Sequence, residues 1–162
     1  VGKILAYCGL MYGKEVTWMP AYGPEQRGGT ANCTVIVSDE RIASPVLSHY
    51  DIAIVLNQPS LDKFLPKVKP GGIVFYEENG IINPPTRTDI TCYKIAAMEK
   101  AAEMKNAKVF NMIVLGALLK VCPIVTTEGL EKALHKTLPS RYHHLLPLNM
   151  QAVAEGMTLV GE

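Results

Sequence analysis

The stretch Asp51-Ile-Ala-Ile-Val-Leu-Asn-Gln-Pro-Ser-Leu-Asp-Lys-Phe-Leu-Pro-Lys-Val-Lys-Pro-Gly-Gly-Ile-Val-Phe-Tyr76 holds two short apolar runs on either side of a helical pattern. Residues 52–56 and 73–76 are nearly continuous in apolar side chains, which is typical of central strands covered on both faces. Between them, apolar residues recur at helical spacing over residues 59–68, and residues 69–72, Lys-Pro-Gly-Gly, predict a stop and a turn. We therefore predict a βαβ unit, in which two parallel strands are joined by a right-handed crossover.

Further apolar runs extend this pattern in both directions along the chain. We expect strands at residues 16–19, 33–37 and 90–95, and helices at residues 1–12, 96–105, 111–120, 128–137 and 149–155. Residues 38–41 are short enough to close a hairpin, which predicts a mixed, mostly parallel sheet. Thr127 is expected to cap the helix after it, and Gly156 to end the last helix. Together the elements predict a single α/β domain over residues 1–162, a three-layer αβα Rossmann-like domain.

Two stretches depart from this regular pattern. The first residue is Val1, and residues 1–12 already read as the middle of a helix with no capping residue in front of it. We therefore expect the chain to lack its natural N-terminal strand and the turn into this helix. Residues 77–88 hold two adjacent prolines and are expected to form an irregular excursion.

Composition and charge narrow the classes of partner. The 162 residues are 48% apolar and 19% charged, which suits one globular domain with a sizeable core. The net charge of +1 gives no electrostatic basis for binding nucleic acid or an anionic membrane, and the apolar runs are too short to span a bilayer. No secretory signal is visible, which favours a cytoplasmic location. We expect no nucleic-acid partner and no membrane partner.

The cysteines are too dispersed to suggest a metal site. Cys8, Cys33, Cys92 and Cys122 contain no Cys-x-x-Cys spacing, whereas iron–sulfur and zinc sites usually draw on closely spaced thiolates. Three of them, Cys8, Cys33 and Cys122, lie within apolar runs, which favours small buried hydrophobic residues. We expect this chain to hold no metal and no cluster of its own.

Residues 22–32, Tyr-Gly-Pro-Glu-Gln-Arg-Gly-Gly-Thr-Ala-Asn, lie between two predicted strands and contain more than a turn requires. Glycines let the backbone approach a ligand closely, and Arg27 offers a planar fork of donors for phosphate or carboxylate. From spacing alone, a long surface loop with one solvated ion pair explains the stretch slightly better than a ligand site does. The candidate contact residues in it are Tyr22, Gly23, Pro24, Glu25, Arg27, Gly28 and Gly29.

A second candidate segment is residues 57–60, Asn-Gln-Pro-Ser, which follow the predicted strand 52–56 directly. Ligands of open α/β sheets bind beyond the carboxyl ends of the strands, and free N–H groups at the start of a helix favour an anion. The side chains of Asn57 and Gln58 can also hydrogen-bond a polar ligand. The alternative, that Ser60 only caps the helix, is at least as well supported by this segment alone.

No autonomous catalytic set can be assembled from the sequence. The four histidines lie outside both candidate segments, and the adjacent His143 and His144 would point apart on a helix, partly exposed or at an interface. The sequence contains no Gly-x-Ser-x-Gly elbow, Walker loop, His-Glu-x-x-His or EF-hand spacing. Residues 77–79, Glu-Glu-Asn, follow a central strand, and a solvated strand-end loop explains them better than a cleft does. We expect no catalytic residue on this chain.

Taken in order, the motifs resemble the gamma subunit of 2-oxoacid:ferredoxin oxidoreductases. The resemblance rests on residues 13–32, with their Tyr-Gly-Pro-Glu-x-Arg-Gly-Gly, on 35–40, on 57–64, beginning Asn-Gln-Pro-Ser, and on 67–72. Weaker similarity at residues 111–116 and 149–156 extends it over nearly the whole chain. The similarity is greatest to the separate-subunit, 2-oxoglutarate-type branch. The strand and the Gly-Gly-Gln-Gly turn with which the family starts are absent from this sequence.

The resemblance implies a subunit that is not catalytic alone, in a complex that oxidatively decarboxylates a 2-oxoacid with coenzyme A. The products would be an acyl-CoA, carbon dioxide and reduced ferredoxin. It implies that the alpha and beta subunits hold thiamine diphosphate, and that other subunits, such as a ferredoxin-like delta subunit, carry the iron–sulfur clusters. Coenzyme A is then a co-substrate, and no cofactor is firmly bound by this chain. Residues 22–29 and Asn57, Gln58 and Ser60 are expected to contact coenzyme A or a partner subunit.

Several alternatives stay open. Within the same family, the enzyme could act on pyruvate, a branched-chain 2-oxoacid or indolepyruvate, because the substrate pocket would lie mainly on other subunits. The chain could instead be a non-catalytic scaffold whose loop is purely an interface. A stand-alone Rossmann-like nucleotide binder is weakened because Gly23, Gly28 and Gly29 do not form the dinucleotide fingerprint.

Overall fold

The computed structural model of the protein describes residues 1–22 and 31–160. The chain forms two compact units, and each is built from two separate segments of the sequence. The first unit comprises Val1–Leu47 and Ile124–Leu146, and the second comprises Ser48–Pro123 and Pro147–Glu162. Each unit has a sheet of its own. The single domain expected over residues 1–162 stays a prediction.

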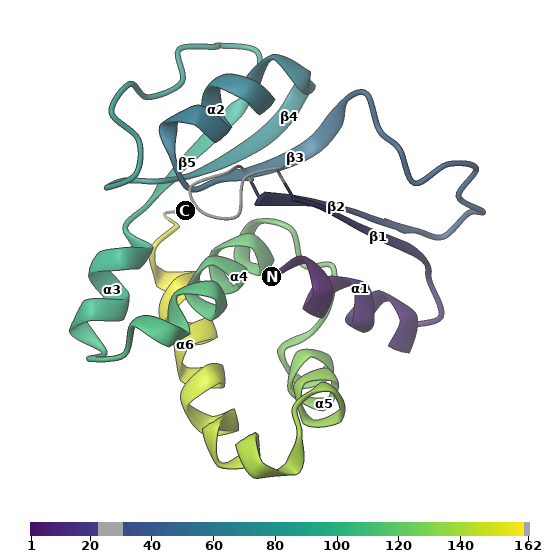
Figure 1. The fold of residues 1–162 in the computed structure, drawn as a ribbon, viewed down its shortest axis with the longest axis vertical. Helices are drawn as coiled ribbons and strands as arrows, with labels where there is room; N and C mark the ends of the chain where they lie inside the picture. Colours follow the sequence, from purple (N-terminus) through teal and green to yellow (C-terminus); the bar gives the residue numbers. More distant parts are fainter. Residues whose placement is uncertain (23–30, 161–162) are drawn as a thin grey trace. The chain divides into compact units, whose positions relative to one another are not determined.

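The first unit is a helix packed on a two-stranded antiparallel ribbon (Figure 1). Strands β1 (Glu15–Tyr22) and β2 (Ala31–Ser38) pair with Trp18 opposite Val35. Helix α1 (Gly2–Met11) lies on the ribbon. Its glycines allow this contact, since a Cβ added at Gly9 would come within 2.7 Å of Val16. The remaining elements of the unit are α5 (Thr127–Thr137) and the 3-10 helix η3 (Ser140–Leu145).

The hairpin expected at residues 38–41 is wrong. Strand β2 pairs with β1, so the hairpin connection is residues 23–30, and residues 39–49 contain neither helix nor strand. The physical reason lies in the residues after Arg41. Ile42-Ala-Ser-Pro45 offers no apolar alternation, and Pro45 cannot donate a ladder hydrogen bond.

The second unit contains a three-stranded parallel sheet in the order β3-β4-β5. Helix α2 (Gln58–Phe64) covers one face of this sheet, and α4 (Phe110–Val121) and α6 (Leu146–Thr158) lie on the other (Figure 1). This arrangement confirms the predicted α/β class and the βαβ unit, although the parallel and antiparallel strands belong to separate sheets. The strands of the second unit are β3 (Tyr50–Val55), β4 (Val68–Glu77) and β5 (Thr91–Ile95). Its helices are α2 (Gln58–Phe64), η1 (Leu65–Lys67), α3 (Ala97–Glu103), η2 (Ala107–Val109), α4 (Phe110–Val121) and α6 (Leu146–Thr158).

The turn expected at residues 69–72 lies inside strand β4. Val68 pairs with Tyr50 and Ile73 pairs with Ile52, so the register shifts across the Lys-Pro-Gly-Gly segment without ending the strand. Gly71 has a φ of +81°, a backbone conformation that side chains other than glycine rarely adopt. The segment is therefore an irregularity within a strand, and the strand begins at Val68.

The core of the second unit follows the alternation of the strands. Leu61 of α2 is buried in a cluster with Val55 and Val74 on one face of the sheet. Phe75, which points to the opposite face, stacks on Tyr93 of the neighbouring strand with 5.3 Å between ring centroids. Helix α4 is buried along eight consecutive residues, 112–119, as expected for a helix that is apolar on all sides.

Helices α4 and α6 approach each other through a reciprocal glycine contact. A Cβ at Gly116 would collide with the carbonyl oxygen of Val153, and a Cβ at Gly156 would collide with that of Ile113. Gly156 therefore lies inside α6 as a packing residue, and its expected role as the end of the helix is wrong. Among the described residues, no helix has the length and apolar character required to cross a bilayer.

Candidate functional site

The glycine-rich segment starts where strand β1 ends. Tyr22 is the last residue of that strand, lies opposite Ala31 and is 79% exposed. The side chain is thus accessible at the end of the ribbon. Six of the candidate contact residues lie outside the described residues: Gly23, Pro24, Glu25, Arg27, Gly28 and Gly29.

The second candidate segment stands at the carboxyl end of β3, where α2 begins. The Oδ1 atom of Asn57 accepts a hydrogen bond of 3.0 Å from the backbone N–H of Ser60, and Asn57 is the N-cap residue of α2. The capping role considered for Ser60 therefore belongs to Asn57. The Asn57 amide nitrogen and the Ser60 hydroxyl form no hydrogen bond within the described part of the chain, and both groups remain open to a ligand or partner.

Gln58 is engaged with its own chain. Its Oε1 accepts hydrogen bonds from the backbone N–H groups of Ile82 at 3.0 Å and Asn83 at 2.8 Å. Its Nε2 donates to Asp62 Oδ1 at 2.9 Å and to the carbonyl oxygen of Asn83 at 3.3 Å. The side chain thereby fixes the loop 80–83 beside the start of α2. The expected contact between Gln58 and a ligand would require these bonds to break, so the structure favours a positioning role.

Gly80 brings the same loop close to strand β3. A Cβ at Gly80 would collide with the carbonyl oxygen of Leu56, so only glycine permits this approach. Ile81 is buried, whereas Ile82 is 83% exposed. The loop is thus anchored on both sides of an outward-facing isoleucine.

Glu77, the last residue of the central strand β4, is fully buried. Its Oε2 accepts a 3.0 Å hydrogen bond from the backbone N–H of Ala97, and its Oε1 accepts one of 3.3 Å from that of Asn79. Neighbouring Glu78 is exposed and forms a 3.1 Å ion pair with Lys94. The solvated strand-end loop expected at residues 77–79 is therefore wrong for Glu77, which ties the strand to the first residue of α3.

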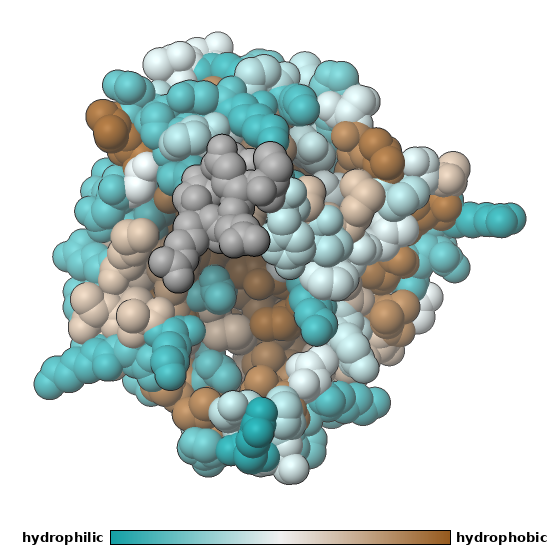
Figure 2. Space-filling view, viewed as in Figure 1, coloured by the Kyte–Doolittle hydropathy of each residue, from teal (hydrophilic) through white to brown (hydrophobic). Residues whose placement is uncertain are grey.

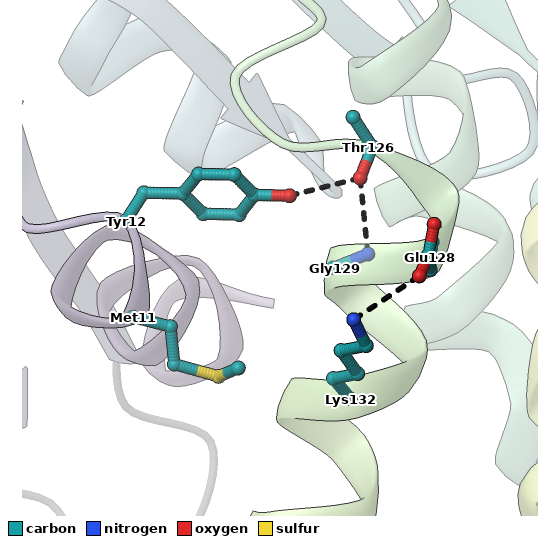
Figure 3. A pocket seen from close by; sticks show the side chains of 6 residues that line it. All are labelled: Met11, Tyr12, Thr126, Glu128, Gly129 and Lys132. Atoms are coloured by element: carbon teal, nitrogen blue, oxygen red, sulfur yellow. Dashed lines mark hydrogen bonds and ion pairs between the residues drawn. The ribbon is translucent and has the colours of Figure 1, made fainter.

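The first unit has a hollow of about 270 Å³ between α1 and α5 that the sequence reasoning did not single out (Figure 3). The hydroxyl of Tyr12 lies 2.8 Å from Thr126 Oγ1, which also accepts a 3.0 Å hydrogen bond from the backbone N–H of Gly129. Glu128 and Lys132 form a 3.1 Å ion pair at its edge. The polar groups of the hollow thus already bond one another. Thr126, and not Thr127 as expected, caps α5.

The cysteines only partly follow the expectation of burial. Cys8 is buried and Cys122 half-buried, whereas Cys33 on β2 is exposed. Burial raises the pKa of the Cys8 and Cys122 thiols, which disfavours the thiolate form that binds metals. Within residues 1–22 and 31–160, no three His, Cys, Asp or Glu side chains lie close enough together to hold a metal ion.

The histidine pair that does form is a different one from the adjacent pair in the sequence. The ring centroids of His135 and His143 lie 4.3 Å apart, and His143 Nε2 lies 2.8 Å from the carbonyl oxygen of Leu138. His144 is exposed. The contacts of His143 thus hold η3 against the end of α5.

A family model described as pyruvate ferredoxin/flavodoxin oxidoreductase matches residues 1–159. The chain belongs to this family. The family-level resemblance found in the sequence is thereby confirmed, whereas the names of the similar proteins include more than one 2-oxoacid.

Two curated members of the family illustrate this spread. The 2-oxoglutarate synthase subunit KorC of Methanocaldococcus jannaschii is 36% identical over 141 residues, which cover 85% of this chain and 75% of that protein. The ketoisovalerate oxidoreductase subunit VorA of Methanothermobacter marburgensis is 37% identical over 119 residues, which cover 74% of this chain and 25% of that protein. The chain thus spans about a quarter of the length of this VorA protein.

Solved structures of the family share the fold. The gamma subunit of a keto/oxoacid ferredoxin oxidoreductase from Geobacter sulfurreducens matches with a TM-score of 0.79 and 26% identity, over 98% of this chain and 88% of that chain. A 2-oxoglutarate:ferredoxin oxidoreductase from Magnetococcus marinus, with 2-oxoglutarate, coenzyme A and succinyl-CoA bound, matches with a TM-score of 0.85 and 25% identity. This match covers 98% of this chain and 28% of that chain.

Proposed function

We propose that the chain is the gamma subunit of a multi-subunit 2-oxoacid:ferredoxin oxidoreductase. Such a complex oxidatively decarboxylates a 2-oxoacid with coenzyme A, and it releases an acyl-CoA and carbon dioxide while two electrons pass to ferredoxin. The observation that carries this proposal is the family match over residues 1–159, together with a KorC relative of comparable length. The chain acts as part of the complex and contributes no catalytic residue of its own.

We further propose 2-oxoglutarate as the substrate. Support comes from the KorC protein of M. jannaschii, whose similarity extends over 85% of this chain, whereas the PorC protein of Methanothermobacter thermautotrophicus, a pyruvate synthase subunit, is 26% identical. Ketoisovalerate is the second candidate, because VorA reaches 37% identity over a shorter region. Copurification of the complex from its native source, followed by assays of 2-oxoglutarate, ketoisovalerate and pyruvate with ferredoxin, discriminates among the three. Faster turnover of ketoisovalerate than of 2-oxoglutarate would reverse this assignment.

The cofactors of the reaction are proposed to lie on partner subunits. Thiamine diphosphate, on the alpha and beta subunits, supplies the carbanion chemistry of decarboxylation, and iron–sulfur clusters elsewhere in the complex accept the electrons. The described residues do not fit a cluster, since Cys8 and Cys122 are buried to different degrees with raised thiol pKa values and no metal-binding group forms. This chain would then contribute binding surface only.

For the ligand contact we propose two segments, Tyr22 to Gly29 and Asn57 to Ser60, facing coenzyme A or a partner subunit. Arg27 supplies a fixed charge for the phosphates of coenzyme A, and glycines allow its close approach. In the second segment the groups available are the Asn57 amide nitrogen and the Ser60 hydroxyl, because Gln58 is engaged with loop 80–83.

Arg27→Ala tests this contact in the assembled complex. Loss of a charge-assisted hydrogen bond to phosphate is expected to raise the KM for coenzyme A at least about tenfold. Arg41→Ala, which removes an exposed arginine from the segment after β2, is the matched control and should leave this KM unchanged. If Arg27→Ala alters neither the KM for coenzyme A nor the assembly of the complex, the segment is an ordinary surface loop.

A further inference from the structure

Residues 77–83 run along the carboxyl ends of the strands of the second unit, and we call this segment the edge loop. It begins at Glu77, the last residue of the central strand β4. Beside the end of β3, a Cβ at Gly80 would collide with the carbonyl oxygen of Leu56 and lie 3.6 Å from the Cα atom of Asn57. The edge loop therefore packs directly against the candidate contact segment that starts at Asn57.

The start of the edge loop is held by the carboxylate of Glu77. This side chain is fully buried, and a buried carboxylate is costly unless hydrogen bonds satisfy it. Its Oε2 accepts a 3.0 Å hydrogen bond from the backbone N–H of Ala97 in α3, whose N-cap residue Ala96 supplies no side-chain cap. Its Oε1 accepts bonds of 3.3 and 3.5 Å from the backbone N–H and the side-chain Nδ2 of Asn79. One carboxylate thus joins the first residue of α3 to the edge loop.

The end of the edge loop is held by Gln58. Its Oε1 accepts hydrogen bonds from the backbone N–H groups of Ile82 at 3.0 Å and Asn83 at 2.8 Å. Between the two ends, Ile81 is buried in the same core cluster as Leu61 of α2. The loop is therefore fixed at both ends and packed in the middle, so a displacement at one end has only a few residues to cross before it reaches the other.

The hydrogen bonds of Glu77 suit a carboxylate and not an amide. Both of its oxygens accept from N–H groups, and an ionised carboxylate offers acceptors only. The side chain of glutamine has the same shape but places an NH₂ group against one of these donors. Glu77→Gln therefore breaks one of the two connections with almost no change in side-chain volume.

We propose that Glu77 is a positioning residue for the binding of coenzyme A. Its carboxylate holds the edge loop against the segment Asn57 to Ser60, and the loop fixes the backbone from which the Asn57 amide nitrogen and the Ser60 hydroxyl meet the ligand. The inference rests on the proposed function, from which it takes the ligand. The surface over α2 is largely hydrophilic (Figure 2), which suits contact with a polar ligand. Glu77 itself is fully buried and acts only through the loop.

A simpler role for Glu77 is to cap α3. The N–H of Ala97 at the start of that helix needs an acceptor, and Glu77 Oε2 supplies it. A cap uses one carboxylate oxygen, however, whereas the bonds to Asn79 use the other. The two roles also differ in what they affect, since a cap alone changes unfolding and a positioning residue changes the KM for coenzyme A.

The test uses the assembled complex and compares Glu77→Gln with Gln58→Ala and with the double variant. Glu78→Gln is the matched control, because it makes the same substitution one residue further along, where the exposed carboxylate pairs with Lys94 at 3.1 Å. The KM for coenzyme A and kcat are measured with ferredoxin and the 2-oxoacid that the complex turns over fastest. Amide hydrogen exchange at residues 82–83 and the thermal midpoint are measured on the same proteins.

We expect Glu77→Gln to raise the KM for coenzyme A at least about fivefold, to leave kcat within about twofold and to speed amide exchange at residues 82–83. Glu78→Gln should change none of the three. Gln58→Ala should raise the same KM. The double variant should raise it no further than the larger single effect, because both side chains act on one loop.

An unchanged KM in Glu77→Gln, with or without a lowered thermal midpoint, would leave Glu77 as a cap of α3 only and overturn the inference, while the proposed function would stand. If Glu77→Gln does not assemble, Gln58→Ala decides, since an unchanged KM in that variant overturns the positioning role of the whole loop and a raised KM supports it. Effects that add in the double variant would show independent action and also overturn the inference. A wild-type complex whose reduction of ferredoxin does not depend on coenzyme A overturns the proposed function and the inference together.

Discussion

At the scale of single residues, Gln58 limits what the candidate site offers to a ligand. Its amide makes four hydrogen bonds within the chain, two of them to the adjacent N–H groups of Ile82 and Asn83. An oxygen that accepts from two neighbouring backbone donors holds a loop with little freedom. The geometry of the second candidate segment therefore depends on a side chain that need not touch the ligand.

Gln58→Ala is expected to free the loop 80–83. Without the amide oxygen, two backbone donors lose their acceptor, and each bond contributes roughly 1 kcal/mol net. The amides of Ile82 and Asn83 should then exchange with solvent about tenfold faster or more, as measured by hydrogen exchange. Asp62→Ala, which leaves the Oε1 bonds intact, is the control. Equal exchange rates in wild type and Gln58→Ala would show that the loop is held by other contacts.

The ion pair of Arg87 and Asp89 makes the free energy of unfolding depend on pH. The guanidinium of Arg87 donates to both carboxylate oxygens of Asp89, at 2.9 and 2.7 Å, and to the carbonyl oxygens of Leu65 and Val68. The hydrogen bonds from Arg87 hold the pKa of the Asp89 carboxyl below its usual value. Because the folded-state pKa is lowered, the pair stabilises the fold above the unfolded value of about 3.9, and this contribution is lost as pH falls through the folded-state pKa.

Asp89→Asn is expected to show this dependence directly. The wild type should exceed the variant in free energy of unfolding at pH 7, and the difference should shrink as the pH falls below about 4. Urea unfolding of both proteins between pH 7 and pH 3 measures it. A difference that stays constant over this range would mean that Asp89 contributes through something other than its charge.

These residue-level roles are beyond what local sequence can reveal. The sequence places Asn57 at the start of a helix, and its capping partner is only three residues away. Gln58 and Glu77, in contrast, bond residues twenty or more positions along the chain. Such partners are set by the fold, and a pattern of neighbouring residues carries no information about them.

At the scale of secondary-structure elements, the start of α5 offers two adjacent threonines of which only one caps. Thr126 Oγ1 accepts the N–H of Gly129, and its extended backbone is that of an N-cap residue. Thr126→Ala should therefore cost about 1 kcal/mol of unfolding free energy, whereas Thr127→Ala should cost much less. Thermal or urea unfolding of the two variants compares them. A larger loss for Thr127→Ala would restore the assignment made from the sequence.

Helices and strands whose pattern lies within their own residues could be predicted from the sequence. Which strand pairs with which was harder to predict. The βαβ unit follows from two buried apolar runs around one helical stripe, and the structure has all three. The hairpin was misplaced because antiparallel pairing depends on which strand β2 meets, and β2 meets β1 across residues 23–30. Gly156 shows the same limit, because a glycine that ends a helix and a glycine that packs against Ile113 look identical in sequence.

At the scale of the whole molecule, the family could be predicted from the sequence, but the substrate could not. Motif order over nearly the whole chain suffices to indicate the family, and the match over residues 1–159 agrees with it. Relatives named for 2-oxoglutarate and for ketoisovalerate are 36% and 37% identical to this chain. The identities of these relatives to this chain therefore do not distinguish the two substrates.

Because each unit is built from two separated segments, the units can be completed only late in synthesis on the ribosome. The first unit begins with α1, β1 and β2 but receives α5 only after the sheet of the second unit has been synthesised. The second unit is likewise incomplete until α6 has been synthesised. A nascent chain that stops before α5 therefore carries two unfinished cores at once, and neither unit can be cut out as one continuous fragment.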